Sequence, residues 1–185
     1  MAEHRDESRV FHGPGERLRA PARLARLEVP RVVELCLSGI EASSVLDVGT
    51  GTGVFAEAFT AAGLSATGID LNPELLAVAR DLVPEAIFME AGADALPCDD
   101  SAHDLVFLGH LLHEVDDPLA VLREARRVAR NRVAVLEWPY REDEQGPPLE
   151  HRMQPETVAD LARQAGFCEV ETLELEHMTL FRMTV

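Results

Sequence analysis

The sequence predicts an α/β protein in which helices cover both faces of a doubly wound, mostly parallel sheet. Short apolar segments typical of buried strands alternate with segments that have helical spacing. Glycine, or an asparagine or aspartate followed by proline, marks many of the boundaries between them. The last two apolar segments follow each other with no helix between them. We therefore expect these two strands to pair antiparallel at or near one edge of the sheet.

The first half of the chain is expected to contain a broken helical segment, three strands and two helices. Pro21 and Pro30 interrupt the helical segment, because proline removes a backbone donor. Asn72 followed by Pro73 is typical of a helix N-cap and first helical position. The expected ranges are 16–39 for the helical segment, 44–48, 64–69 and 86–89 for the strands, and 54–62 and 73–82 for the helices.

The second half continues the alternation. Asp117 and Pro118 repeat the cap-and-proline pattern, and a helix follows whose expected apolar face is Leu119, Leu122, Ala125 and Val128. Strands are expected at 103–108 and 132–137, a long polar loop at 138–154, a helix at 155–165, and two strands within 168–185 on either side of Glu176 and His177.

Composition restricts the classes of partner. The net charge is -16 and the chain contains no lysine, so we expect no nucleic-acid substrate, no P-loop lysine and no Schiff-base lysine. No apolar segment is long enough to span a membrane, and the polar residues 1–10 do not resemble a secretory signal, so a cytoplasmic protein is expected. The three cysteines are widely spaced, and no metal site is expected.

A glycine-rich segment carries the sharpest functional signal. Asp47, Gly49, Thr50, Gly51 and Gly53 lie between the first expected strand and the helix after it. Open α/β sheets bind ligands at this carboxyl edge, where glycine permits close approach and the helix N-terminus offers free N–H groups. The spacing differs from the GxGxxG pattern of dinucleotide sites, and Asp47 would repel a pyrophosphate. Asp47 instead suits a positively charged group, such as an α-amino group.

A second acidic residue supports a nucleoside-like ligand. Asp70 ends the second expected strand, about twenty residues after the glycine loop, where a carboxylate can accept hydrogen bonds from both hydroxyls of a ribose. Together, the two acids and the glycine loop predict a ligand with a ribose, a cationic group and no phosphate.

These residues resemble the class I S-adenosylmethionine-dependent methyltransferases, and most of all their small-molecule branch (type 11 domain), which includes ubiquinone and menaquinone methyltransferases. The resemblance extends from about Val45 to Phe167. It rests on the segments Val45–Gly53, Gly68–Asn72, Ala91–Pro97 and His103–Phe107, and on 152–156 with 165–167. It implies a Rossmann-like sheet of seven strands in the order 3-2-1-4-5-7-6, with the last strand antiparallel. It also implies S-adenosylmethionine as the cofactor.

The resemblance further implies a role for each matching residue. The cofactor-binding residues would be Asp47, Gly49, Thr50, Gly51 and Gly53 around the methionine part, Asp70 on the ribose, Leu71, Asp94 and Ala95 around the adenine, and Gly109 and His110 near the sulfonium. We expect a single domain over residues 1–185. Residues 1–40 would form an arm and helices that cover the site, and residues 41–185 would form the core.

The chain departs from nucleic-acid methyltransferases in this family. Gly109–His113 stands where an Asn-Pro-Pro-Tyr-like segment would act on a base amine, and no Pro-Cys pair is present for cytosine chemistry. The expected substrate is therefore a small-molecule methyl acceptor. Either the N-terminal segment and the loop after Trp138 enclose it, or a second subunit does so in a homodimer.

Catalytic residues are hard to identify, because methyl transfer from a sulfonium depends mainly on positioning. His110 and His113 are the candidates for a general base, and helix capping or packing against the cofactor is their structural alternative. Glu114, Asp116, Asp117 and Glu137 lie near strand ends, but the metal motif of catechol-type enzymes is absent. Three alternative functions remain: a non-catalytic S-adenosylmethionine-binding protein, an aminopropyltransferase and, least favoured, a dinucleotide oxidoreductase.

Overall fold

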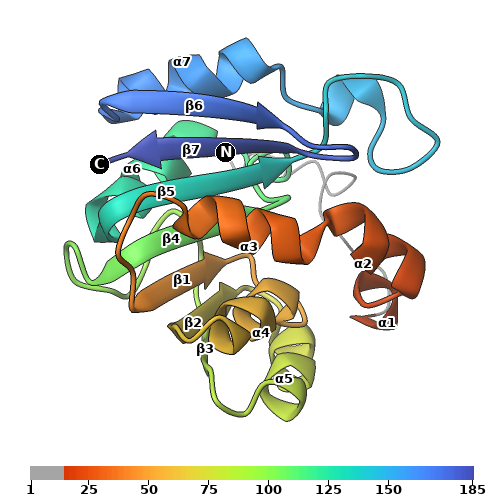
Figure 1. Ribbon diagram of the computed structural model, residues 1–185, viewed down its shortest axis with the longest axis vertical. Coiled ribbons are helices and arrows are strands. Elements are labelled where there is room, and N and C mark those ends of the chain that lie inside the picture. Colours follow the sequence, from red (N-terminus) through yellow and green to blue (C-terminus); the bar gives the residue numbers. More distant parts are fainter. Residues whose placement is uncertain (1–14) are drawn as a thin grey trace, which may run out of the picture.

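A computed structural model describes residues 15–185, so the expected N-terminal arm lies almost wholly outside the described residues. Within that range, seven strands form one sheet in the order β3-β2-β1-β4-β5-β7-β6 (Figure 1). β7 pairs antiparallel with both β5 and β6, and the other pairings are parallel. The predicted strand order and the antiparallel last strand are confirmed. The strands are β1 Ser44–Val48, β2 Ser65–Asp70, β3 Ile87–Glu90, β4 His103–Gly109, β5 Ala129–Glu137, β6 Glu169–Glu174 and β7 Thr179–Thr184.

Helices cover both faces of the sheet, as expected (Figure 1). α3, α4 and α5 bury apolar side chains against one face, in a core that includes Val45 of β1. α6 and α7 pack on the other face, in a core that includes Leu46, since neighbouring residues of a strand point to opposite faces. The helices are α1 Gly15–Leu18, α2 Pro21–Leu27, α3 Val29–Leu37, α4 Val54–Ala61, α5 Pro73–Leu82, α6 Pro118–Val128 and α7 Pro155–Ala165, with a short 3₁₀ turn η1 at Leu149–His151.

The predicted caps form, because the side chains of Asn72 and Asp117 each accept hydrogen bonds from the first turn of their helix. The broken helical segment differs from expectation. Its second break lies at Glu28, whose backbone is left-handed with φ of 49°. Pro30 lies inside the first turn of α3, where a missing N–H leaves no intrahelical bond unmade.

Two details around α6 also differ from expectation. Val121, and not Leu119, joins Leu122, Ala125 and Val128 on the buried face. β5 begins at Ala129, three residues earlier than expected, because the backbone becomes extended at the helix C-cap and pairs with β4 at once. The remaining strand and helix bounds lie close to the expected ones.

Parallel strands bring their carboxyl ends to one edge of the sheet. The last residues of β1, β2, β4 and β5 are Val48, Asp70, Gly109 and Glu137. Every predicted site residue lies in one of these strands or follows one of them or β3. Among residues 15–185, no helix is both long enough and apolar enough to cross a membrane.

Candidate cofactor and acceptor site

The glycine loop has the backbone that its sequence predicts. Gly49, Gly51 and Gly53 have φ angles of 73°, 54° and 78°, which side chains with a Cβ rarely adopt. The N–H groups of Gly49 and Thr50 donate to the carbonyl of Ile69, 2.8 and 2.9 Å away, and so join the loop to β2. The loop therefore lacks a side chain at three positions at the start of α4, where Leu111, Leu18 and Phe88 pack close to its glycines.

Asp47 is buried beneath this loop and holds its shape. Its Oδ2 accepts hydrogen bonds from Thr50 Oγ1 at 2.6 Å and from the backbone N–H of Ala56 at 3.1 Å. Burial raises the pKa of Asp47 to about 7; the two hydrogen bonds oppose this rise, and the charge of Asp70 adds to it. A cationic group placed beside Asp47 would favour its ionised form.

Asp70 connects the end of β2 to the glycine loop. Its Oδ2 accepts from the N–H of Gly51 at 2.8 Å, and its Oδ1 accepts from the N–H of Asn72 at 2.9 Å. Each carboxylate oxygen can accept a further hydrogen bond, so the group suits a pair of ribose hydroxyls. The neighbouring Leu71 side chain is 56% exposed and offers an apolar surface at the same edge.

The segment 91–98 after β3 borders the site and is anchored by α6. Glu124 accepts from the N–H of Leu96 at 3.0 Å, and Arg127 donates to the carbonyls of Leu96 and Cys98 at 3.0 and 2.8 Å. Asp94 and Ala95 are exposed in this anchored segment. The segment is therefore held in place without using the two residues predicted to contact an adenine.

His110 follows β4 directly and occupies an unusual backbone conformation. Its φ is 58°, and its N–H donates to the carbonyl of Leu136 at 2.8 Å. Both ring nitrogens are buried and have no hydrogen-bond partner among residues 15–185. Burial, then the charge of Arg23 and the neighbouring His113, lowers the pKa of His110 well below its usual value. A neutral, unsatisfied imidazole at this position suits hydrogen bonding to a ligand.

His113 and Glu137 form a buried pair at the ends of β4 and β5. The Nδ1 of His113 lies 2.7 Å from Oε2 of Glu137, and the N–H of His113 donates to Oε1 at 3.3 Å. Burial lowers the pKa of His113, but the charge and hydrogen bond of Glu137, assisted by Glu114, outweigh this and raise it.

Arg23 brings a cation from α2 to the same edge of the sheet. Its Nε is buried and has no hydrogen-bond partner within the described range. Burial lowers the pKa of Arg23, and the charge of Glu114 partly offsets this. Because an incompletely paired guanidinium favours negative charge nearby, this part of the site suits an anionic or polarised ligand.

Trp138 lies between His110 and the loop that follows β5. The ring centroids of His110 and Trp138 are 4.9 Å apart, and the guanidinium carbon of Arg152 lies 5.7 Å from the Trp138 centroid. Gly146 packs against the indole, since a Cβ at Gly146 would lie 2.7 Å from the ring. The indole is 8% exposed and is therefore part of a packed wall.

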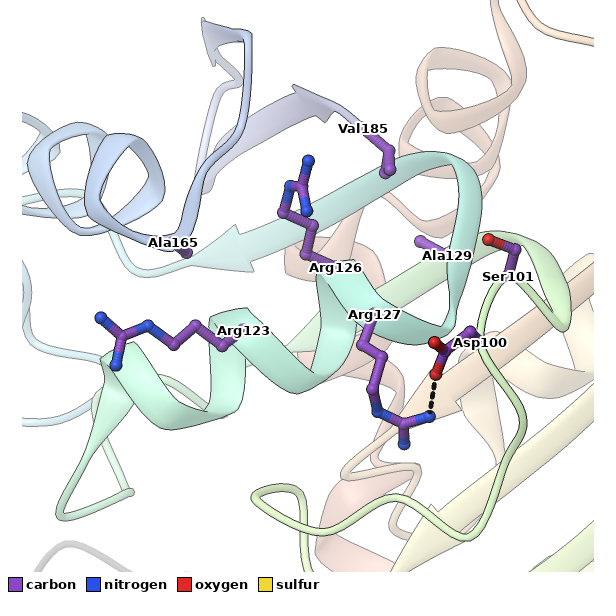
Figure 2. A pocket seen from close by; sticks show the side chains of 8 residues that line it. All are labelled: Asp100, Ser101, Arg123, Arg126, Arg127, Ala129, Ala165 and Val185. Carbon is purple, nitrogen blue, oxygen red and sulfur yellow. Dashed lines mark hydrogen bonds and ion pairs between the residues drawn. The ribbon is translucent and has the colours of Figure 1, made fainter.

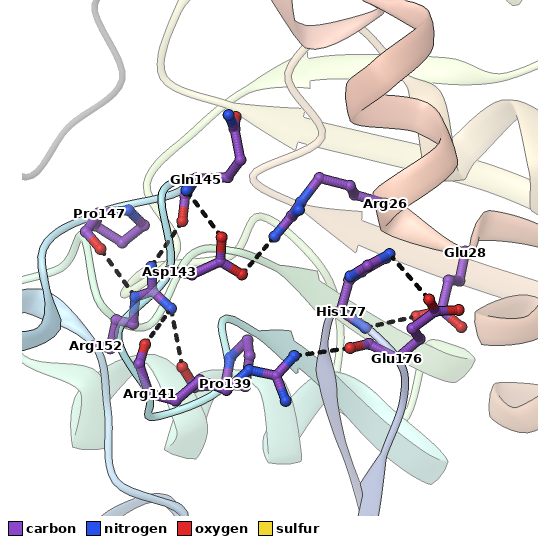
Figure 3. Close-up of polar contacts among 10 residues, drawn as sticks. All are labelled: Arg26, Glu28, Pro139, Arg141, Asp143, Gln145, Pro147, Arg152, Glu176 and His177. Atoms are coloured by element: carbon purple, nitrogen blue, oxygen red, sulfur yellow. Dashed lines mark hydrogen bonds and ion pairs between the residues drawn. The ribbon is translucent and has the colours of Figure 1, made fainter.

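Arg152 fixes the loop 138–154 by donating to four backbone carbonyls (Figure 3). Two contacts connect this loop to neighbouring segments: Arg26 of α2 pairs with Asp143 at 2.7 Å, and Arg141 donates to the carbonyl of Glu176 at 2.8 Å. The four carbonyls belong to Pro139, Arg141, Gln145 and Pro147, at 2.7–3.1 Å. The loop is therefore ordered and tied to α2.

α1 covers the glycine loop from the other side. A Cβ at Gly51 would lie 3.2 Å from the Leu18 side chain. Arg19 donates to the carbonyl of Thr52 and pairs with Glu57 of α4, each at 2.6 Å. Part of the segment that was expected to cover the site thus contacts the glycine loop, through α1 and the Arg19 that follows it.

A surface pocket at the opposite edge of the sheet is separate from this site. It is lined by Arg123, Arg126 and Arg127 of α6, together with Ala129 at the start of β5 and the terminal Val185 (Figure 2). The carboxyl-edge residues do not line it. Within the described part of the chain, no group of three His, Cys, Asp or Glu side chains is arranged to hold a metal ion.

The predicted residues gather at one edge of the sheet, in two groups. The glycine loop, Asp47, Asp70 and Leu71 lie at β1 and β2, while Gly109, His110 and His113 lie at β4. The sequence did not single out Arg23, nor did it assign Arg152 to the organisation of the loop. The pairing of Glu137 with His113 was also missed, although its position at a strand end was noticed.

Comparisons with known proteins agree with this geometry. The family described as "Methyltransferase domain" matches residues 46–136. A demethylmenaquinone methyltransferase of Chlorobaculum tepidum is 36% identical over 95 residues, which cover 51% of this chain and 39% of that protein. A ubiquinone biosynthesis O-methyltransferase of Sodalis glossinidius is 35% identical over 100 residues, covering 50% of this chain and 39% of that protein. The aligned part thus spans less than half the length of these curated relatives.

Similarity of structure extends over nearly the whole chain. The crystal structure of an S-adenosylmethionine-dependent methyltransferase from Aquifex aeolicus matches with a TM-score of 0.81 and 26% identity, covering 92% of this chain and 96% of that one. The residues at the carboxyl edge fit the cofactor of this family, since the glycine loop has the positive φ angles of a tight turn beside Asp70, and both ring nitrogens of His110 are buried without a partner among residues 15–185. The family match, the curated relatives and the structural similarity together support a class I S-adenosylmethionine-dependent methyltransferase.

Proposed function

We propose that this protein transfers a methyl group from S-adenosylmethionine to a small organic molecule. The observation that carries the proposal is the hydrogen bond from Gly51 to Asp70, which joins the glycine loop and the acidic end of β2 into one surface. On this surface, Asp70 binds the ribose and Leu71 borders the adenine, with Asp94 and Ala95 beyond it. Asp47 and the loop residues Gly49, Thr50, Gly51 and Gly53 bind the methionine part.

The acceptor occupies the space beside β4 and β5. Gly109 and His110 border the sulfonium, beside Trp138, which packs against His110, and the loop 138–154, which is tied to α2. The cofactor supplies a methyl group on a cationic sulfur, which is already activated for an in-line displacement. The chain's own residues then position the acceptor and exclude water, which account for most of the rate in such a reaction.

The class of acceptor follows from the walls of this space and from the relatives. Trp138 and His110 present aromatic surfaces, and Arg23 favours a polarised or anionic group. Relatives of the matched segment are named for demethylmenaquinone and ubiquinone biosynthesis. A small quinone-related or phenolic aromatic is the acceptor that we infer. We further propose that residues 1–185 act as one domain in the cytoplasm, and that residues 15–40, the described part of the N-terminal segment, cover the site.

The proposal is tested with S-adenosylmethionine labelled in its methyl group. The protein is incubated with this cofactor and separate sets of hydroxybenzoates, catechols and naphthoquinols, and labelled product is measured together with S-adenosylhomocysteine. We expect labelled product from at least one of these sets. The Asp70→Asn variant is expected to form no product, and the exposed Asp81→Asn variant is expected to form it as the wild type does. Cofactor binding without transfer to any set would favour the non-catalytic binding protein instead.

A further inference from the structure

The contact between His113 and Glu137 connects the segment after β4 to the end of β5, 24 residues further along the sequence. Both side chains are nearly inaccessible, with 5% and 2% of their side-chain surface exposed. Burial of a carboxylate costs free energy because the group loses its hydration, and a partner that donates a hydrogen bond to it offsets part of that cost. Glu137 therefore accepts the Nδ1–H of His113, and this hydrogen bond sets the tautomer of the ring.

With Nδ1 as the donor, Nε2 of His113 carries the lone pair of the neutral ring. Nε2 makes no hydrogen bond within residues 15–185, and the carboxylate oxygen Oε1 of Glu114 lies 3.8 Å from it. A histidine with one nitrogen hydrogen-bonded to a carboxylate and the other without a hydrogen bond in the described part of the chain has the arrangement of a general base. The carboxylate keeps the ring oriented and stabilises the imidazolium that forms.

Charged groups reach His113 from each element around it. Glu137 lies on β5 and Glu114 on the segment after β4, and both favour a proton on the ring. Arg152 of the loop opposes the proton, and His110 lies 6.5 Å away between ring centroids. His110 differs from His113 in having no carboxylate against its ring, so these two histidines have different chemical roles.

We infer that His113 is the general base of this methyltransferase, that Glu137 is its positioning residue, and that the acceptor atom is an ionisable hydroxyl oxygen. The inference rests on the proposed function and specifies its acceptor. The acceptor O–H bond breaks and its proton moves to Nε2 of His113. An oxygen–carbon bond to the methyl group forms as the sulfur–carbon bond breaks, and the bonding pair remains on sulfur as a neutral thioether.

Charge balances over this step. One positive charge leaves sulfur and one positive charge is present on the imidazolium at the end, next to Glu137. The positive charge of Arg23 acts on His110, and it would also stabilise the negative charge that develops on the acceptor oxygen as this oxygen attacks the methyl group. The proton acceptor and the cation together explain why two buried histidines and a buried carboxylate occur at one end of the sheet.

The test uses 4-nitrocatechol, whose absorbance reports ionisation of its hydroxyl, with the full-length protein and S-adenosylhomocysteine. We expect the hydroxyl pKa of the bound probe to lie at least about one unit below that of the free probe, so that the bound probe ionises at a proton concentration about tenfold higher. His113→Asn is expected to abolish this shift, and Glu137→Gln to reduce it. His177→Asn, on the turn between β6 and β7, is the matched control and is expected to keep it.

Titration with S-adenosylhomocysteine accompanies each variant and separates the two proposals. Unchanged affinity in His113→Asn, together with a normal circular dichroism spectrum, shows that the variant has folded. A probe that does not bind, binds as the neutral phenol, or ionises equally in His113→Asn would overturn the role of His113 alone. A wild-type protein that binds no S-adenosylhomocysteine would contradict the proposed function itself, and with it the role of the pair.

Discussion

The carboxylate of Asp70 accepts a hydrogen bond from the backbone N–H of Gly51, 2.8 Å away, and this contact connects the end of β2 to the loop after β1, where a ligand would bind. The carbonyl of Ile69, the residue before Asp70, accepts from the N–H groups of Gly49 and Thr50. The end of β2 therefore holds the glycine loop through three hydrogen bonds. Changes at this edge are expected to affect ligand binding and loop shape together.

Asp47 is expected to make stability depend on pH. Its pKa in the folded protein is about 7, above its ordinary value of 3.8, because of burial. The folded state therefore binds the proton more tightly than the unfolded chain. Its contribution to the free energy of unfolding falls as pH rises from about 4 to about 7. Asp47→Asn removes this titration, so its urea-denaturation midpoint is expected to vary less with pH across that window.

The same variant separates folding from binding. An asparagine can accept the hydrogen bonds from Thr50 and Ala56 through its Oδ1, so the loop retains its anchor. It lacks the negative charge that a cationic ligand group requires. Weaker binding of S-adenosylhomocysteine at pH values above about 7, without loss of stability, is expected. Unchanged affinity would exclude Asp47 from the binding of a cationic group.

Asp104 is expected to support the fold without contributing to the site. Its carboxylate accepts from the backbone and hydroxyl groups of Ser43 and Ser44 and pairs with Arg130 at 2.5 Å. The hydrogen bond from the Ser43 backbone, with the other donors, lowers its pKa against the effect of burial. Its stabilising contribution is thus present above its ordinary pKa of 3.8 and is lost as pH falls through its lower folded-state pKa.

Replacement of this residue gives a clear readout. Asp104→Asn is expected to lower the free energy of unfolding by about 2–4 kcal/mol, because buried donors lose a charged acceptor. Chemical denaturation measures this change, and the exposed Asp99→Asn is the control. Since Asp104 lies at the opposite edge from Asp70, affinity for S-adenosylhomocysteine should stay the same in folded protein. A large loss of affinity would contradict this separation.

Arg152 is expected to control the order of the loop 138–154. Its guanidinium donates to four carbonyls that a lysine ammonium cannot reach together. Arg152→Lys should lower stability by about 1–3 kcal/mol and increase proteolytic cleavage within residues 139–151. The exposed Arg163→Lys on α7 is the control. Equal cleavage rates in the two variants would show that other contacts hold the loop.

His110 is expected to contribute to function at the expense of stability. Its two ring nitrogens are buried without partners in the described range, and each such group costs about 1–3 kcal/mol. His110→Phe retains the aromatic contact with Trp138 and removes both nitrogens. We expect equal or higher thermal stability and at least about tenfold slower methyl transfer. If His110→Phe lowers the thermal stability and leaves the rate of methyl transfer unchanged, the imidazole of His110 has only a packing role.

Much of the fold could be predicted because the strand, cap and turn preferences of short sequence segments agree with the structure that those segments adopt in the folded protein. The apolar strands, the caps at Asn72 and Asp117 and the glycine loop are all encoded within a few neighbouring residues. The break at Glu28 could not be predicted, since glutamate carries no preference for the left-handed backbone that it adopts there. The early start of β5 likewise depends on its pairing with β4, which is a tertiary effect.

The site was predictable as a set of strand ends but not as a set of contacts. Asp47 and Asp70 could be found because each has a fixed distance from the glycine loop. The pairing of His113 with Glu137 depends on how β4 and β5 align, and no local pattern reports that alignment. The role of Arg152 depends on carbonyls of an irregular loop, which carry no sequence signal.

Calorimetric titration with S-adenosylhomocysteine of the wild type, Asp70→Asn and Asp81→Asn tests the account most directly. The account predicts dissociation constants of about micromolar order for the wild type and Asp81→Asn. It predicts binding at least about thirtyfold weaker for Asp70→Asn, since the ribose hydroxyls lose a charged acceptor worth about 2 kcal/mol or more. A folded wild-type protein that binds no ligand, or an Asp70→Asn variant that binds equally well, would contradict it.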